Sequence, residues 1–216
     1  MKINKIALAC GVAMLGVSVH SMAEVSMNIG ATSNYIWRGV TQTEDAAAIS
    51  GGVDWASDIG LYAGAWASNV QFAPDTTPYE LDLYGGYSAE VGDFGYDAGL
   101  IYYTYDGDAD ANFLELALSG SWKFLNAGFN YTLSADNDDA EGDLYYFAGL
   151  SFDLPQDFAI GGTIGSYDYD AGGDYTHFQI DLTKSAGDFG DVSLSLTDTD
   201  LDNDDPIFFV SWGKSF

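Results

Sequence analysis

Short turns alternate with long acidic loops at a regular spacing along this chain. Short turn-like segments fall at 57–60, 92–95, 125–128, 154–157 and 187–190, and their polar turn residues follow one another at steps of 31 to 35 positions. A step of that size fits one hairpin, with two strands of about 10 residues, one short turn and one longer loop. Outer-membrane barrels sort their connections in this way, with short turns on one side and long loops on the other.

The longer connections are rich in carboxylates and lie near 39–46, 73–78, 106–111, 136–143, 169–174 and 200–206. Between turns and loops the sequence predicts strands at 25–38, 47–57, 60–72, 79–91, 94–105, 112–124, 127–135, 144–153, 158–168, 175–184, 189–199 and 207–216. An even number of strands puts both chain ends on one side of a barrel. The fold predicted is therefore an all-β, transmembrane, antiparallel up-and-down barrel of about twelve strands, with ten and fourteen left open.

Alternation within the strands supports two-faced walls. In 112–124, Leu114, Leu116 and Leu118 oppose Glu115 and Ser119, so the leucine face is expected to meet lipid. The same sorting is found in 79–91, 175–184 and 189–199, whereas 60–72 does not sort cleanly. The strands of a soluble antiparallel sandwich would also alternate. A membrane barrel is favoured by the regular alternation of short turns with long loops and by the aromatic residues near strand ends.

The chain ends on an alternating strand, 207–216, with Phe208, Val210 and Trp212 on one face and Phe216 as its last residue. This is typical of the closing strand of an outer-membrane barrel, and Phe216 is the expected contact with the barrel-assembly machinery. The strand should pair with 25–38, because only that pairing removes both sheet edges. Lys214 falls on the lipid-facing parity, which is tolerable near an interface.

The opposite terminus predicts export. Lys2 and Lys5 precede an apolar run, 6–19, that is too short for a spanning helix and is followed by a small-residue site at Ala23. We expect residues 1–23 to be a cleaved signal peptide and 24–216 to be the barrel, located in the outer membrane of a Gram-negative bacterium. Cys10 allows a weaker alternative, in which the chain is a lipoprotein. If residues 1–23 are removed instead, the exported chain has no cysteine.

The charge balance excludes one class of partner. The chain has 33 Asp and Glu residues against 6 Lys and Arg, for a net charge of −27. Nucleic acid is therefore an unfavourable ligand, whereas cations are favoured. Fifteen Tyr, 13 Phe and 5 Trp are more aromatics than a disordered acidic chain would contain. Expected partners are outer-membrane lipids and lipopolysaccharide, together with small solutes or cations.

Arg38 is the one arginine of the sequence and lies at the end of the first predicted strand. Alternation turns Tyr35 and Trp37 toward lipid and Asn34, Ile36 and Arg38 inward. A buried guanidinium needs a carboxylate partner. Either a charged constriction or a structural ion pair bracing the lumen would follow. The predicted pore-lining residues are Asn34, Arg38, Glu80, Asp82, Asp97, Glu115, Lys123, His177 and Asp181. The five carboxylates among them, Glu80, Asp82, Asp97, Glu115 and Asp181, are the candidate partners of Arg38.

A family resemblance also rests on this region. The segment S-N-Y-I-W-R-G-V-T-Q-T at 33–43, the segments 62–70 and 80–87, and the ending K-S-F at 214–216 resemble the proteobacterial TorF-type porin family along essentially the whole chain. The resemblance implies an outer-membrane barrel with channel activity. It assigns no catalytic residues.

Neither catalysis nor a cofactor is predicted. His177 has no nucleophile motif beside it, and 198–202 lacks the glycine and glutamate of a calcium loop. Loop carboxylates could instead share divalent cations with lipopolysaccharide phosphates. The function predicted is passive diffusion of small solutes with a preference for cations, and the alternative is a non-conducting structural or adhesive barrel.

Overall fold

The computed structural model describes residues 24–72, 79–106, 111–202 and 205–216. The predicted signal peptide, 1–23, lies outside this part of the chain, as do 73–78, 107–110 and 203–204 of three predicted acidic loops. Among the described residues no helix is both long and apolar enough to cross a membrane.

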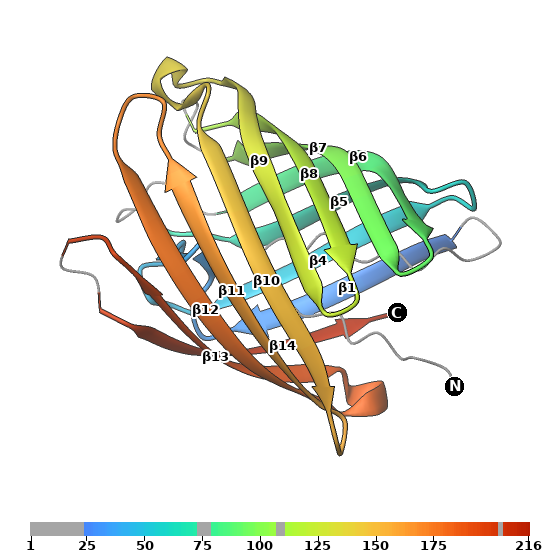
Figure 1. Ribbon diagram of the computed structural model, residues 1–216. Helices are drawn as coiled ribbons and strands as arrows, with labels where there is room; N and C mark the ends of the chain where they lie inside the picture. The colour runs from blue at the N-terminus through green and yellow to red at the C-terminus, as the bar shows by residue number, and fades with distance from the viewer. Residues whose placement is uncertain (1–23, 73–78, 107–110, 203–204) are drawn as a thin grey trace.

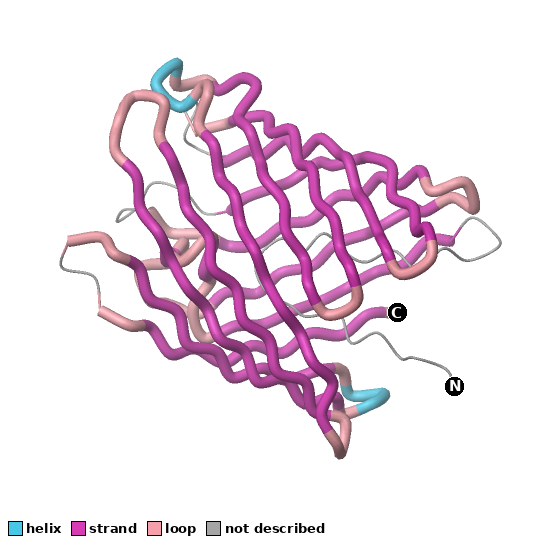
Figure 2. Tube along the Cα trace, viewed as in Figure 1, coloured by secondary structure: helices cyan, strands magenta, loops and turns pink. Residues whose placement is uncertain are grey.

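The described residues form a closed antiparallel barrel with twelve long strands (Figures 1 and 2). The predicted fold class and strand number are confirmed. Around the wall each strand pairs with its neighbours in the order β1-β14-β13-β12-β11-β10-β9-β8-β7-β6-β5-β4. The strands are β1 (Glu24–Thr32), β4 (Ala48–Ala56), β5 (Leu61–Asn69), β6 (Tyr79–Val91), β7 (Phe94–Tyr105), β8 (Phe113–Trp122), β9 (Leu125–Ala135), β10 (Leu144–Leu154), β11 (Phe158–Asp168), β12 (Asp174–Ser185), β13 (Asp191–Thr199) and β14 (Ile207–Ser215).

Four shorter elements lie in the connections. Two 3-10 helices, η1 (Asp138–Ala140) and η2 (Gly187–Phe189), belong to the β9–β10 and β12–β13 connections. A two-stranded sheet of β2 (Ile36–Trp37) and β3 (Val40–Thr41) lies between β1 and β4 and is not part of the barrel wall. We call the end of the barrel with the longer connections the loop end and the opposite end the turn end.

The barrel closes where the sequence predicts, between the first and last strands (Figure 1). Asn28 pairs with Ser215 and Thr32 with Ser211. The backbone of Phe216 exchanges two hydrogen bonds with Met27, at 3.2 and 2.8 Å. Closure matters because an open strand edge would leave unpaired backbone groups facing the hydrocarbon of a membrane.

The two faces of the wall differ as the alternation predicts. Phe208 and Leu194 are 71% and 52% exposed on the outside, whereas Ser195 and Asp181 point inward and are 1% exposed. In β5, where the sequence is ambiguous, Tyr62, Trp66 and Ser68 lie on the more buried face and Ala63, Ala65 and Ala67 alternate with them. The sequence of β5 is ambiguous because alanine is small and only weakly apolar. The alternating alanines therefore weaken the contrast between the apolar and polar faces.

The first strand is shorter than predicted. It ends at Thr32 rather than at residue 38, and residues 33–47, which we call the mouth loop, fold inward. Asn34 holds the turn: its Oδ1 accepts from Thr41 Oγ1 at 2.6 Å and its Nδ2 donates to Asp45 Oδ1 at 2.8 Å. The predicted lipid-facing positions of Tyr35 and Trp37 are therefore wrong, because these side chains pack inside the barrel.

A charge placed on the outer face should test the membrane orientation of the wall. We expect Leu194→Lys, at the middle of β13, to lower the free energy of unfolding by about 2–4 kcal/mol, because lysine at the bilayer midplane is costly. Lys214→Leu, near the end of β14, should change it by only about 0–1 kcal/mol. Urea unfolding in lipid vesicles measures both. Equal effects would contradict the assignment of this face to lipid.

Candidate functional site: a loop folded into the barrel

The mouth loop carries a β-hairpin whose turn reaches into the barrel. Ile36 pairs with Thr41 and Trp37 with Val40, so Arg38 and Gly39 form a two-residue turn. Both have positive φ angles, 51° and 90°, as a type I′ turn requires. A left-handed arginine costs about 1–2 kcal/mol, so other contacts must hold it in this conformation.

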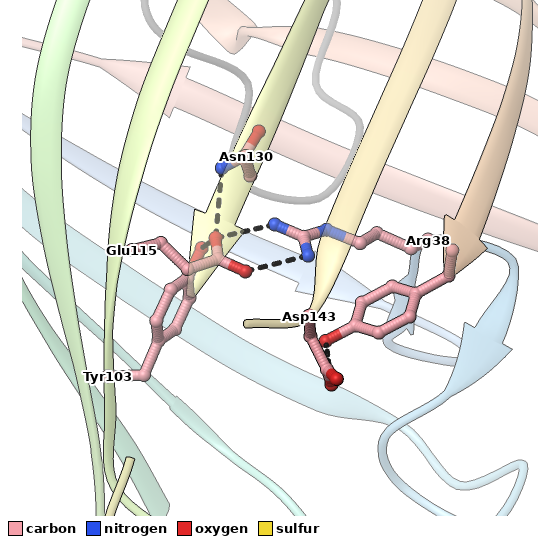
Figure 3. A network of polar contacts seen from close by, with 6 residues as sticks. Arg38, Tyr103, Glu115, Asn130 and Asp143 are labelled. Atoms are coloured by element: carbon pink, nitrogen blue, oxygen red, sulfur yellow. Dashed lines mark hydrogen bonds and ion pairs between the residues drawn. The ribbon is translucent and has the colours of Figure 1, made fainter. Parts of the chain in front are cut away.

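The strongest contact is a bidentate ion pair between Arg38 and Glu115 on β8. Arg38 Nη1 donates to Glu115 Oε1 at 2.8 Å and Nη2 donates to Oε2 at 2.6 Å, with side chains 7% and 1% exposed. Glu115 Oε2 also accepts from Asn130 Nδ2 at 2.9 Å and Tyr103 Oη at 3.4 Å (Figure 3). The carboxylate is thus fully engaged, which a buried ion pair needs in order to be stable.

Aromatic rings surround the guanidinium on its other sides. Its central carbon lies 4.0 Å from the ring centre of Trp37, 4.3 Å from that of Tyr145 and 5.5 Å from that of Tyr167, distances at which cation–π attraction is appreciable. Tyr175 Oη donates to the Arg38 carbonyl at 3.0 Å. The hairpin therefore joins the β7–β8 part of the wall to the β10–β12 part.

Gly39 fits tightly against the opposite wall. A β-carbon at this position would lie 2.5 Å from His177 Cβ and 3.0 Å from Thr199 Cγ2. His177 itself is 4% exposed and its Nε2 lies 3.0 Å from Tyr145 Oη. Glycine is favoured here for two reasons: the positive φ is strained for a residue with a side chain, and the close wall leaves no room for a β-carbon.

The base of the mouth loop packs near two carboxylates on β6. Tyr35, 6% exposed, lies with its ring centre 5.6 Å from that of Trp66 and donates from Oη to Glu80 Oε1 at 3.2 Å. Burial and the charges of Glu80 and Asp82 raise the pKa of the Tyr35 hydroxyl well above its ordinary value. Tyr35 therefore remains a hydrogen-bond donor.

Asp143, in the connection before β10, supports the aromatic group from the loop end. It accepts from Tyr167 Oη at 3.1 Å and from the Asp170 backbone N–H at 2.9 Å. Burial raises the pKa of its carboxyl. This carboxyl group therefore fixes the position of Tyr167, whose ring is one of those beside Arg38.

The predicted pore-lining residues fall into separate groups. Arg38 meets Glu115, and His177 stands behind the hairpin turn. Asp181 instead accepts from Ser195 Oγ at 2.6 Å and Gln179 Nε2 at 2.9 Å, while Asp97 accepts from Tyr62 Oη at 2.8 Å near the turn end. Of the five inward carboxylates that were candidate partners of Arg38, only Glu115 forms an ion pair with it in the described part of the chain.

Lys123 lies elsewhere than predicted. The expected strand 112–124 ends at Trp122, and Lys123 occupies the following turn with a φ of 56°. Its Nζ lies 4.7 Å from the centre of the Trp122 ring. Lys184 and Lys214 also lie near the turn end, so Arg38 is the cation of the described barrel interior.

Sequence reasoning missed the residues that complete the site. They are Trp37, Tyr103, Asn130, Asp143, Tyr145, Tyr167 and Tyr175. Most lie on wall strands at inward positions near the loop end, so strand parity combined with strand order could have selected them. Their convergence on Arg38 depends on the inward fold of the mouth loop, which no local pattern indicates.

The fold and this charged, loop-filled interior define a porin-like β-barrel. Among solved structures, a KdgM porin matches with a TM-score of 0.61 at 8% identity, covering 88% of this chain and 98% of that one. A KdgM porin in complex with disordered oligogalacturonate matches at 0.59 and 7%, covering 90% and 98%. A NanC porin matches at 0.52 and 11%, covering 89% and 98%. At these identities the likeness concerns the fold.

The family is identified by sequence. The family model described as "Bacterial protein of unknown function (Gcw_chp)" matches residues 17–211, and the chain belongs to this family. The TorF-type name expected from the resemblance is not the one that the family model gives, although the porin-like fold agrees with it. No curated protein matches the chain.

Proposed function

We propose that this protein is a porin-like channel of the bacterial outer membrane that passes small solutes by diffusion and prefers cations. The observation that carries the proposal is the mouth loop, a charged hairpin fixed across the interior of a closed barrel. Such a loop narrows the barrel at its loop end, and the residues around it set the field that a solute meets. Selection would be by size and charge rather than by chemistry on the solute.

The cation preference rests on the inward charges. Asp54, Asp97 and Asp181 lie on the inner face together with Glu80 and Asp82, while Arg38 is already neutralised by Glu115. The interior therefore has a negative field, which attracts cations and repels anions. One of the matched KdgM structures contains an oligogalacturonate, an acidic saccharide, and we expect a compound of that charge to be disfavoured here.

The outer-membrane location is supported by the apolar exterior of the barrel and by the signal peptide predicted at 1–23. We propose that the partners are outer-membrane lipids and lipopolysaccharide, and that the assembly machinery engages the strand ending at Phe216. With the loop end facing outward, the acidic connections would lie where they can share divalent cations with lipopolysaccharide phosphates.

Planar-bilayer recording tests the channel. Purified protein should give discrete conductance steps, and the reversal potential in a potassium chloride gradient should have the sign of cation preference. Asp97→Asn, near the turn end, should reduce the preference, whereas Lys123→Ala, in an exposed turn, should leave it nearly unchanged. A reversal potential of the opposite sign would contradict the proposed selectivity.

A second function, a non-conducting structural or adhesive barrel, is favoured by the tightness of the same loop. Arg38 and Glu115 are almost completely covered, as a plug would require. Absence of conductance from the wild-type protein, together with conductance after the mouth loop is released, would support this second function over the first.

A further inference from the structure

Two carboxylates on β6 lie inside the barrel beneath the mouth loop. Glu80 and Asp82 are 1% and 0% exposed. Glu80 pairs across the sheet with Ser68 on β5 and Tyr105 on β7. Asp82 pairs with Trp66 and Tyr103 on the same two strands. The acids are thus enclosed by aromatic side chains and are two positions apart on one face of one strand.

The side chains around these acids do not balance their charge. Tyr35 Oη donates to Glu80, and Glu80 and Asp82 lie within hydrogen-bond reach of each other, but within the described part of the chain no N–H or O–H group of the protein donates to either carboxylate oxygen of Asp82. Arg38 is paired with Glu115, and Glu115 adds a further negative charge to the surroundings of Asp82. An ionised carboxylate buried without a partner is very costly, so either a proton shared by the two acids or a bound cation must compensate for the charge.

We propose that Glu80 and Asp82 bind one inorganic cation from solution. The two acids carry a charge of −2 when ionised, which favours a divalent ion. In the described residues no group of three or more acidic, histidine or cysteine side chains converges, but Mg²⁺ is commonly held by one or two carboxylates and retains several water molecules. The hydroxyl oxygen of Tyr35, 3.2 Å from Glu80 Oε1, is a further oxygen atom that such an ion could reach.

A shared proton is the competing explanation. One proton between the two acids would neutralise one of the two charges and leave one oxygen of Asp82 without a partner. A cation can satisfy both oxygens and both charges at once. This proposal rests on the proposed cation preference and assigns part of it to one binding site. Cation binding at this site is measured without recording conductance, so failure of the site and failure of the channel can be told apart.

Cation-dependent stability of the folded barrel in detergent is the first measurement. On a gel run without boiling, the folded barrel migrates differently from the unfolded chain, and heating converts one band into the other. In the wild type, the temperature of this conversion should rise with Mg²⁺ concentration and then reach a plateau. Asp82→Asn should abolish the saturable rise. Asp181→Asn is the matched control, because Asp181 is equally buried but accepts from Ser195 and Gln179, and it should keep the rise.

Terbium luminescence gives a second measurement that does not depend on stability. Tb³⁺ bound at Asp82 should be excited through Trp66, its cross-strand neighbour. Saturable emission should be present in the wild type and in Asp181→Asn, weaker in Trp66→Phe, and lost in Asp82→Asn. The proposal is overturned if wild type and Asp82→Asn respond alike to both cations. It is also overturned if Asp82→Asn stabilises the barrel to the same extent as acidification and no saturable cation binding is seen, since that outcome identifies a shared proton.

Discussion

Replacing Arg38 with alanine is expected to widen the channel and to destabilise the folded barrel. The change leaves Glu115 buried without its cation, and removing one partner of a buried ion pair costs about 3–5 kcal/mol. The guanidinium contacts with Trp37 inside the hairpin and with Tyr145 and Tyr167 on the wall are also lost. We expect a larger single-channel conductance together with a lower midpoint of urea unfolding.

A double-mutant cycle separates the ion pair from the rest of this effect. Glu115→Gln removes the negative partner, and combining it with Arg38→Ala should recover part of the lost stability because no unpaired carboxylate then remains. Lys184→Ala is the control, since the Lys184–Asp157 pair spans 3.4 Å between side chains 41% and 78% exposed and should be worth about 0–1 kcal/mol. Unchanged conductance in folded Arg38→Ala would exclude the mouth loop as the constriction.

The second large effect is expected for Gly39→Ala, which changes no charge. The added methyl group would meet His177 and Thr199, and alanine also disfavours the positive φ of this turn. We expect the hairpin to be displaced from the wall, with conductance rising while the ratio of cation to anion permeability stays near that of the wild type. Reversal potentials and step sizes measured on the same channels test both parts.

Gly172→Ala provides the matched control for this second change. Gly172 has a φ of 101°, but nothing lies within 4 Å of the position where its β-carbon would be. It should therefore show only the backbone cost, about 1–2 kcal/mol, with no change of conductance. If the two alanine variants lose equal stability and conduct alike, the close contact between Gly39 and the wall does not hold the mouth loop in place.

The barrel wall could be predicted from the sequence because its signals are local. A period of two within strands and a regular spacing of turns indicate about twelve strands, the closing pair and the outer face without knowledge of distant contacts. Lys123 was misplaced by one strand boundary, which is the least reliable part of such a prediction.

The inward fold of the mouth loop could not be predicted in the same way. Alternation continues through Tyr35, Ile36 and Trp37, so the segment reads as an unbroken strand. It leaves the wall because Asn34 organises a polar turn and because Arg38 finds its partners on remote strands. Parity placed Glu115 among the candidates, but only the closed arrangement of β8 opposite the hairpin singles it out.

The separation along the chain between the mouth loop and its anchors has a consequence for assembly. Arg38 lies 77 positions before Glu115 and 137 before Tyr175. Contacts between such distant segments form only after the intervening chain has been ordered. The hairpin of the mouth loop is therefore synthesised early but can dock only after β8 and β12 are in place. An assembling barrel should pass through a stage with a wider and more permeable entrance before the mouth loop narrows it.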